Sequence, residues 1–276
     1  KDTLGILNLG TKALLKIANV KSYKIPEKWS GYVAYTLEDV KKEGEKDKDS
    51  ITEKKEKKKK KKKVSKKTGH HVVLRNLETQ KEDTLKFVTD YTFAKEGMFF
   101  SYTTTGPDKD SDAGVFVKNL ENGATQNIHS AKKAKYSQLA FSDSGKNLGF
   151  VVDTDTTKIQ IRPNALFHWK EGETKAAQLV DSKTSPEGYL VSSDGKVSFS
   201  KDESKLFFGL RKPPVIKDTT RTAEEISNVE VWTYDEPRLY TVQELQLKND
   251  TIRSYQSAIQ LNSNTLVQLA TTDYPN

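Results

Sequence analysis

Residues 198–210 read SFSKDESKLFFGL, and the same pattern occurs twice earlier in the chain. The earlier copies are TFAKEGMFFSY at 92–102 and AFSDSGKNLGFVV at 140–152, and EKWSGYVAY from Glu27 is a degenerate further copy. In each full copy a Phe precedes a polar turn and then a hydrophobic run, as in a β-hairpin. The three heading residues are Phe93, Phe141 and Phe199.

A second pattern alternates with the first and consists of a strand-like run that ends in a polar turn. It reads ILNLGT from Ile6, LRNLET from Leu74 and FVKNLENG from Phe116, with weaker copies in FHWKEG from Phe167 and VWTYDE from Val231. The spacing is about 40–50 residues once 41–67 and 212–228 are set aside, which is typical of a four-stranded propeller blade. The sequence therefore predicts an all-β fold, a partial β-propeller with about four to five blades. A pair of β-sandwiches is the competing architecture.

Other elements are few. Strand-like runs also occur at 31–35, 148–152, 206–208 and 229–232, whereas only 11–18 and 222–227 are candidates for a helical turn or two. No apolar run approaches the length of a membrane-spanning helix. The chain has no Cys, which excludes disulfides, thiolate metal sites and a thiol nucleophile.

The net charge of +8 comes from one tract. Residues 41–67 hold 15 Lys and 6 acidic residues, whereas the other 249 residues hold 31 basic and 32 acidic ones. This tract has only two apolar residues, so we interpret it as a disordered Lys-rich insertion in a hairpin. A contact with an anionic surface or an acidic partner is the alternative. Nucleic-acid binding is disfavoured because the tract lacks Arg and the aromatic residues that stack on bases.

One family resemblance covers nearly the whole chain outside this tract. PEGYLVSSDGKVSFSKDESKLFFGLRKPPVIKDTT at 186–220, followed by SNVEVWTYDEPRL, resembles the propeller of bacterial prolyl-oligopeptidase-family (S9) serine peptidases. The stretches 2–38 and 252–271 look like neighbouring parts of that propeller. The resemblance implies an N-terminal propeller that admits short peptides to a C-terminal α/β-hydrolase domain, in a periplasmic or secreted bacterial enzyme.

The sequence departs from the family in lacking the Gly-x-Ser-x-Gly nucleophile motif. We therefore expect a non-catalytic fragment of a longer hydrolase, organised as one propeller segment over 1–276 with a flexible loop at 41–67 and a loop excursion at 212–228. Its function would be to filter peptide substrates for the hydrolase domain. The alternative is a stand-alone propeller that binds a protein or another ligand and has no peptidase activity.

Candidate site residues are few. In the dipeptidyl-peptidase branch of the family, a Glu pair binds the free amino terminus of the substrate, and Glu224 and Glu225 are the matching pair here, although the aromatic context is missing. A solvated helical turn is the simpler interpretation of the pair. We assign no catalytic residue, metal ligand or cofactor. The Asp-Ser-Gly and Ser-Asp-Gly stretches are expected to form Asx-type turns. None of the four His residues is assigned as a catalytic base, and the His70–His71 pair lacks a third metal ligand at a fixed spacing. The four are His70, His71, His129 and His168.

Overall fold

The computed structural model describes residues 2–38, 69–106 and 111–275, except for 156, 158, 215, 217–219, 221–224, 226–230 and 232. The expected insertion at 41–67 lies outside the described residues, as does most of the expected excursion at 212–228. Within the described part, the chain forms strands that pair only in antiparallel fashion, together with one helix. None of the described helices is long and apolar enough to cross a membrane.

The chain begins with a hairpin and continues through two blades that share a strand. The hairpin consists of β1 (Thr3–Leu7) and β2 (Leu14–Ala18). The following seven-stranded sheet runs through β3 (Val20–Lys24), β4 (Tyr32–Leu37), β5 (His70–Asn76), β6 (Glu82–Phe93), β7 (Phe99–Thr104), β8 (Asp112–Asn119) and β9 (Thr125–Lys132). The strand β6 pairs with β5 up to Val88 and with β7 from Val88 onward. It therefore ends blade 1 and begins blade 2.

Two further blades complete the described fold. Blade 3 consists of β10 (Lys135–Phe141), β11 (Asn147–Asp153), β12 (Asn164–Lys170) and β13 (Ala177–Val180). Blade 4 consists of β14 (Leu190–Val191), β15 (Ser198–Phe199), β16 (Lys205–Arg211), β17 (Tyr255–Gln260) and β18 (Thr265–Gln268), with β14 and β15 both paired to β16. The described residues thus form four blades and a two-stranded hairpin, in agreement with the expected blade number.

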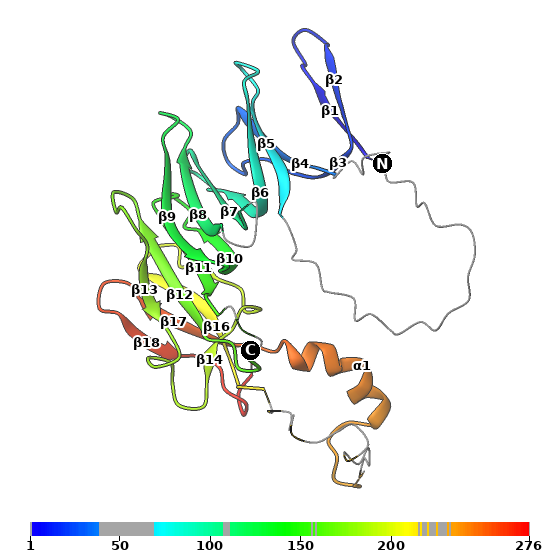
Figure 1. Cartoon of the computed structure of the whole chain (residues 1–276), viewed down its shortest axis with the longest axis vertical. Helices are drawn as coiled ribbons and strands as arrows, with labels where there is room; N and C mark the ends of the chain where they lie inside the picture. The colour runs from blue at the N-terminus through cyan, green and yellow to red at the C-terminus, as the bar shows by residue number, and fades with distance from the viewer. Residues whose placement is uncertain are drawn as a thin grey trace, which may run out of the picture.

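The blades are stacked side by side in an arc, in the order of the chain (Figure 1). Their first strands converge, because β10 contacts both β6 and β15. We call this converging side the axial side of the arc. The arrangement is that of a β-propeller, in which the first strand of each blade lies nearest the central channel.

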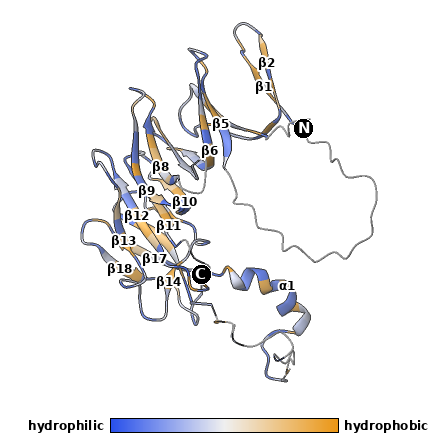
Figure 2. Ribbon diagram, viewed as in Figure 1, coloured by the Kyte–Doolittle hydropathy of each residue, from blue (hydrophilic) through white to orange (hydrophobic). Residues whose placement is uncertain are grey.

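Apolar side chains alternate between the two faces of each blade, because every inner blade has a neighbour on both sides. In β11, Leu148, Phe150 and Val152 belong to the core shared with blade 2, whereas Val151 belongs to the core shared with blade 4. Figure 2 shows the hydrophobic stripes along these strands. Four such clusters hold the arc together, one at each junction from the N-terminal hairpin to blade 4.

The Phe-headed pattern is one structural unit in all three copies. Phe93, Phe141 and Phe199 end the first strand of blades 2, 3 and 4 and lie opposite Phe100, Leu148 and Leu206. The next residue then donates its backbone N–H to the carbonyl that begins the second strand, with N···O distances of 2.9, 2.9 and 3.0 Å. We call these connections the Phe-headed turns.

The second pattern also has a common structure, built on an Asn side chain. Oδ1 of Asn8, Asn76 and Asn119 accepts hydrogen bonds from the backbone N–H groups two and three residues later. The backbone N–H of the same Asn donates a hydrogen bond to the backbone carbonyl of the residue five positions later, with an N···O distance of 2.9 Å in all three turns. The Asn76 and Asn119 turns join the third and fourth strands of blades 1 and 2, and the Asn8 turn joins the two strands of the N-terminal hairpin.

The structure corrects three sequence-based expectations. Residues 11–18 form a turn and β2 rather than a helix, because Ile17 pairs with Leu4 and Leu15 with Ile6. Of these side chains, Leu4, Ile6 and Ile17 pack against blade 1. The described residues of 231–236 belong to no strand, and the third strand of blade 4 is β17 instead. The connection from β16 to β17 is therefore longer than 212–228. It spans 212–254 and contains the helix α1 (Tyr240–Thr251).

Candidate functional site

A cavity of about 530 Å³ opens on the axial side of the arc. Its wall is built by the first strands of three consecutive blades, from β6, β10 and the β14–β15 segment, together with Glu27 and the start of two Phe-headed turns. Because first strands converge in a propeller, this is the place where side chains far apart in the sequence meet. Three blades contribute side chains to its wall, which makes it the candidate site.

The wall is partly apolar. Phe93 and Phe141, which head the turns of blades 2 and 3, line it together with Leu139, Ala140 and Val197. Phe93 is held by aromatic contacts behind it, with ring centroids 4.9 Å from Phe100 and 5.7 Å from Trp29. Phe93 and Phe141 are thus partly buried in the core and partly exposed to the cavity.

Charged side chains surround this apolar surface. The Lys95 ammonium lies 3.8 Å from a carboxylate oxygen of Glu27 and 3.8 Å from one of Asp143. The Asp90 carboxylate lies 3.4 Å from the ammonium of Lys24, a residue that does not line the cavity. Lys196 is the fifth charged residue of the wall, after Glu27, Asp90, Lys95 and Asp143. Exposed ion pairs at such distances contribute little to stability.

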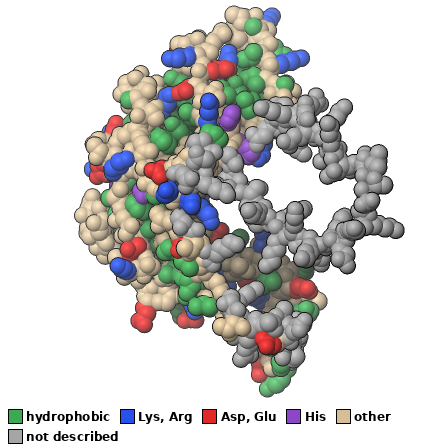
Figure 3. Space-filling view, in the orientation of Figure 1, with side chains coloured by type: hydrophobic (Ala, Val, Ile, Leu, Met, Phe, Trp, Pro, Cys, Tyr) green, Lys and Arg blue, Asp and Glu red, His purple; other side chains and the backbone are tan. Residues whose placement is uncertain are grey.

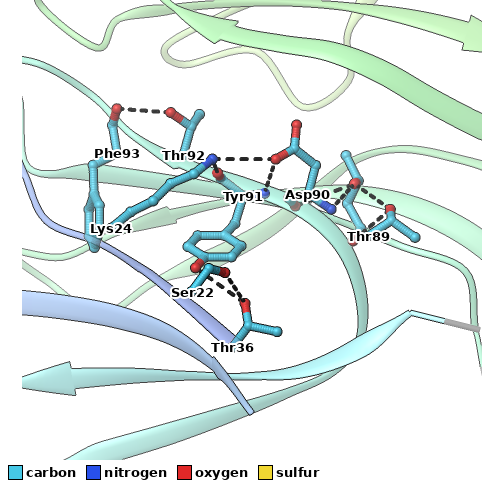
Figure 4. A network of polar contacts seen from close by, with 9 residues as sticks. Ser22, Lys24, Thr36, Thr89, Asp90, Tyr91, Thr92 and Phe93 are labelled. Carbon is cyan, nitrogen blue, oxygen red and sulfur yellow. Dashed lines mark hydrogen bonds and ion pairs between the residues drawn. The ribbon is translucent and has the colours of Figure 1, made fainter. Parts of the chain in front are cut away.

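Lys24 and Asp90 belong to a network that joins the first strands of blades 1 and 2 (Figure 4). Lys24 Nζ donates to the carbonyl of Tyr91 at 2.5 Å and lies 4.8 Å from the centre of the Tyr91 ring. Thr36 Oγ1 donates to Tyr91 Oη at 3.3 Å, and Ser22 Oγ donates to Thr36 Oγ1 at 3.3 Å. The network fixes the backbone from which Asp90 projects.

The Phe-headed turns are also linked from blade to blade. Lys28 N–H donates to the Lys95 carbonyl at 3.3 Å, and Glu96 N–H donates to the Asp143 carbonyl at 2.9 Å. At the next junction the Ser144 N–H donates to the Glu203 carboxylate at 2.8 Å. These contacts set the spacing of the turns along one rim of the cavity.

Glu203 has the most contacts of these linking residues. Its carboxylate also accepts hydrogen bonds from Ser144 Oγ at 2.8 Å and Asn147 Nδ2 at 3.0 Å. Burial raises the pKa of Glu203, but the hydrogen bonds from Ser144, Ser142 and Asn147 outweigh it, and the net pKa lies below the ordinary value. Glu203 is therefore ionised at neutral pH.

Glu224 and Glu225 are the candidate pair expected from the sequence. Glu224 lies outside the described residues, and Glu225 is an exposed residue of the 212–254 connection that does not line the cavity. The proposed role of this pair in binding an amino terminus therefore stays a prediction. In the Asp143 and Asp194 turns, the side-chain acceptors are Ser144, Ser142 and Ser192 rather than Asp, which corrects the expected Asx turns.

The four His residues are dispersed over three strands. His70 and His71 begin β5, His129 lies in β9, and His168 lies in β12. Burial lowers the pKa of His129, with a further lowering by Lys175, and burial likewise lowers the pKa of His168. Among the residues described, no three His, Asp or Glu side chains converge as metal ligands would. Figure 3 shows Lys, Arg and acidic side chains interspersed on the face in view.

Comparisons with known proteins give structural similarities of low identity. No protein-family model matches the chain, and no curated protein sequence matches it. An oligogalacturonate lyase in complex with manganese superposes with a TM-score of 0.48 and 9% identity, over 98% of this chain and 60% of that one. An acylaminoacyl peptidase from Pyrococcus horikoshii superposes with a TM-score of 0.45 and 10% identity, over 90% of this chain and 32% of the peptidase. A prolyl endopeptidase superposes with a TM-score of 0.41 and 14% identity, over 72% of this chain and 29% of the endopeptidase.

The chain thus spans three-fifths of the lyase and about a third of each peptidase. The structural neighbours include propeller domains of S9 peptidases, and all three TM-scores lie below 0.5. The activities in these names belong to those proteins and do not assign a family to this chain.

The axial cavity could be predicted from the sequence only in part. The Phe-headed repeat marked the strands that line the cavity. The contacts between blades, however, join residues about 60 positions apart in the sequence, such as Lys24 with Asp90 and Ser144 with Glu203. No local spacing encodes such pairs. The missed signal is that the second residue after each heading Phe is charged in all three copies, as Lys95, Asp143 and Lys201.

Proposed function

We propose that this chain is a non-catalytic propeller segment of a prolyl-oligopeptidase-like serine peptidase and filters peptide substrates for a hydrolase domain that these 276 residues do not contain. The observation that carries the proposal is the axial cavity, where three first strands present apolar side chains framed by charges. An extended peptide has both kinds of group along its length. A folded protein cannot present its backbone to so small a cavity.

The filter acts by size and by charge. The cavity volume of about 530 Å³ accommodates a few residues of an extended chain. Phe93, Phe141 and Val197 offer apolar contact, and the ionic groups of the wall select among polar side chains. No chemical step is assigned to these residues, because catalysis would occur in the hydrolase domain.

The test is peptide binding to the full chain, measured by fluorescence anisotropy with short labelled peptides. Ala140→Trp places a bulky side chain in the cavity wall and should abolish binding, whereas Ala177→Trp on the exposed strand β13 is the matched control. Thr92→Trp is a second blocking variant in case Ala140→Trp does not fold by circular dichroism. Equal binding by the blocking and control variants contradicts the proposal.

A second test addresses the parent protein. The reading frame should continue into a hydrolase domain with Gly-x-Ser-x-Gly followed by Asp and His. The purified chain should release no product from a peptide substrate over the time in which a control peptidase digests it completely. Turnover by this chain alone would refute a non-catalytic role.

A stand-alone interaction module is the second candidate, and the connection at 212–254 favours it. The helix α1 buries none of its residues, and Leu245 and Leu247 in it are 83% and 65% exposed. Exposed apolar side chains on an inserted helix suit a protein partner. A reading frame without a hydrolase domain would favour this candidate over the peptidase segment.

A further inference from the structure

The first strand of blade 4 is interrupted at the axial cavity. β14 pairs with β16 at Leu190 and Val191, and β15 resumes the pairing at Ser198. The six residues between them, 192–197, form a loop that we call the axial loop. Neither blade 2 nor blade 3 has such an interruption in its first strand.

Contacts within blade 4 hold the axial loop in place. Ser192 N–H donates to the Gly209 carbonyl at 2.9 Å, and Ser192 Oγ accepts from the N–H groups of Asp194 and Gly195 at 3.1 and 3.2 Å. Gly195 lies directly against Gly209, where a Cβ on Gly195 would come within 2.5 Å of the Gly209 Cα. Only glycine permits this approach of two backbones.

Blade 3 holds the axial loop from the other side through Gln138. This residue has a φ of 58° at the point where the register between β10 and β11 shifts. Its side-chain amide donates to the Ser193 carbonyl at 3.0 Å. A left-handed conformation at a non-glycine residue costs of order 1 kcal/mol and persists where the surroundings impose it. Here it directs the amide across the blade junction.

Held in this way, the loop presents Lys196 and Val197 to the cavity. Glu27 and Asp143 both face Lys95, and Asp90 faces Lys24. Lys196 is exposed, and among the described residues it has no ion-pair partner. The wall thus carries one cation without a counter-charge, next to the apolar surface formed by Leu139, Phe141 and Val197.

We propose that Lys196 is the carboxylate-binding residue of the axial cavity, and that the cavity selects peptides with a carboxylate next to an apolar side chain. This inference rests on the proposed function, because it names the peptide class that the filter prefers. The Lys196 ammonium donates charge-assisted hydrogen bonds to the carboxylate. The neighbouring apolar side chain packs on Leu139, Phe141 and Val197. Because the axial loop is already ordered, binding costs little further conformational entropy.

The carboxylate can belong to an acidic side chain or to a free C-terminus, so the peptide set separates the two. The probes are three labelled pentapeptides that each contain one Phe. One has an internal Glu next to Phe and an amidated C-terminus, one has Gln in place of Glu and a free C-terminal carboxylate beside Phe, and one has Gln and an amidated C-terminus. Each is titrated against the full chain by fluorescence anisotropy.

The wild-type chain should bind at least one carboxylate peptide roughly fivefold more tightly than the neutral peptide, as expected for a charge-assisted hydrogen bond from an exposed lysine. Lys196→Gln should abolish this preference and leave affinity for the neutral peptide unchanged. Lys146→Gln, which removes an exposed lysine from the blade 3 turn outside the cavity wall, is the matched control and should retain it. Lys196→Glu should reverse the preference toward a peptide with Lys in place of Glu.

Gln138→Gly separates positioning from direct contact. Glycine accepts the φ of 58° but removes the amide that holds Ser193, so the carboxylate preference should weaken while affinity for the neutral peptide is kept. If peptides bind but Lys196→Gln keeps the wild-type preference, the inference is wrong and the proposed function stands. If no peptide binds the wild-type chain, both are wrong.

Discussion

Glu203 shows how a single residue can replace glycine and link two blades. In the aligned Phe-headed turns, Gly97 and Gly145 occupy the position of Glu203. Gly145 has a φ of 79° and Glu203 a φ of 56°, both in the left-handed region. Blade 4 therefore carries a strained backbone at this point, and the carboxylate that binds Ser144 and Asn147 compensates for it.

Substitutions at Glu203 separate strain from hydrogen bonding. Glu203→Ala removes the hydrogen bonds and keeps the strain, so the free energy of unfolding should fall by about 1–3 kcal/mol. Glu203→Gly removes both and should cost about 1 kcal/mol less than Glu203→Ala. Urea denaturation of the two variants and the wild type measures this difference. Equal stability of the two variants would show that the backbone at this position is unstrained.

The lowered pKa of Glu203 predicts a pH dependence. A carboxyl group whose pKa is lower in the folded than in the unfolded state stabilises the fold above the unfolded value, ordinarily about 4.5 here. That contribution is lost as the pH falls through the folded-state pKa. The stability difference between wild type and Glu203→Gln should therefore be largest near neutral pH and should disappear in acid. Thermal denaturation across this range tests it, and a difference that grows in acid would contradict the assignment.

At the scale of elements, the Asn turn is the device that the sequence reveals most directly. The side chain and backbone of one Asn form the same three hydrogen bonds in β1–β2, β5–β6 and β8–β9. Local chemistry of this kind can be inferred from a motif, because all its partners lie within five residues. This explains why the repeats and the blade number were predictable.

The Asn119 turn offers a direct test of this element. Asn119→Ala removes the acceptor for the Glu121 and Asn122 N–H groups, and the free energy of unfolding should fall by about 1 kcal/mol. Asn119→Asp retains a side-chain oxygen and should remain close to wild type. The two variants are compared by chemical denaturation. A loss of the same size in Asn119→Asp would mean that the amide group, not the acceptor oxygen, stabilises the turn.

The connection at 212–254 could not be predicted in the same way. The apolar residues of α1 follow no single helical face and none of them is buried, so no hydrophobic period marks the helix. The strand-like appearance of VWTYDE was misleading, because the described residues of 231–236 pair with no strand. Only the pairing of Leu210 with Tyr255 shows that 212–254 is an insertion between two adjacent strands.

Removal of this insertion tests that interpretation. Because α1 buries none of its residues and β16 and β17 are neighbours, replacing 212–254 with a short Asn-Gly turn should leave the fold intact. The melting temperature should change by no more than about 4 °C, corresponding to roughly 1–2 kcal/mol in a chain of this size. Loss of the cooperative transition in the shortened chain would show that the connection is part of the core.

At the scale of the whole molecule, the net charge and the arrangement of the blades suggest different kinds of binding partner. The net charge of +8 suggests a polyanion, but outside 41–67 the chain is nearly neutral. The arc instead gathers its first strands around a cavity with apolar and charged walls. The candidate site therefore depends on how the blades are assembled, which explains why composition alone did not point to it.

The most direct test of peptide binding on the axial side is photo-crosslinking followed by mass spectrometry. A short unfolded peptide with a benzophenone group is irradiated with the full chain, and the attachment sites are mapped. We predict crosslinks within 90–95, 138–143 and 196–198, which lie on three different blades and line one cavity. Crosslinks confined to α1 or to the outer strands β9, β13 and β18 would contradict the account.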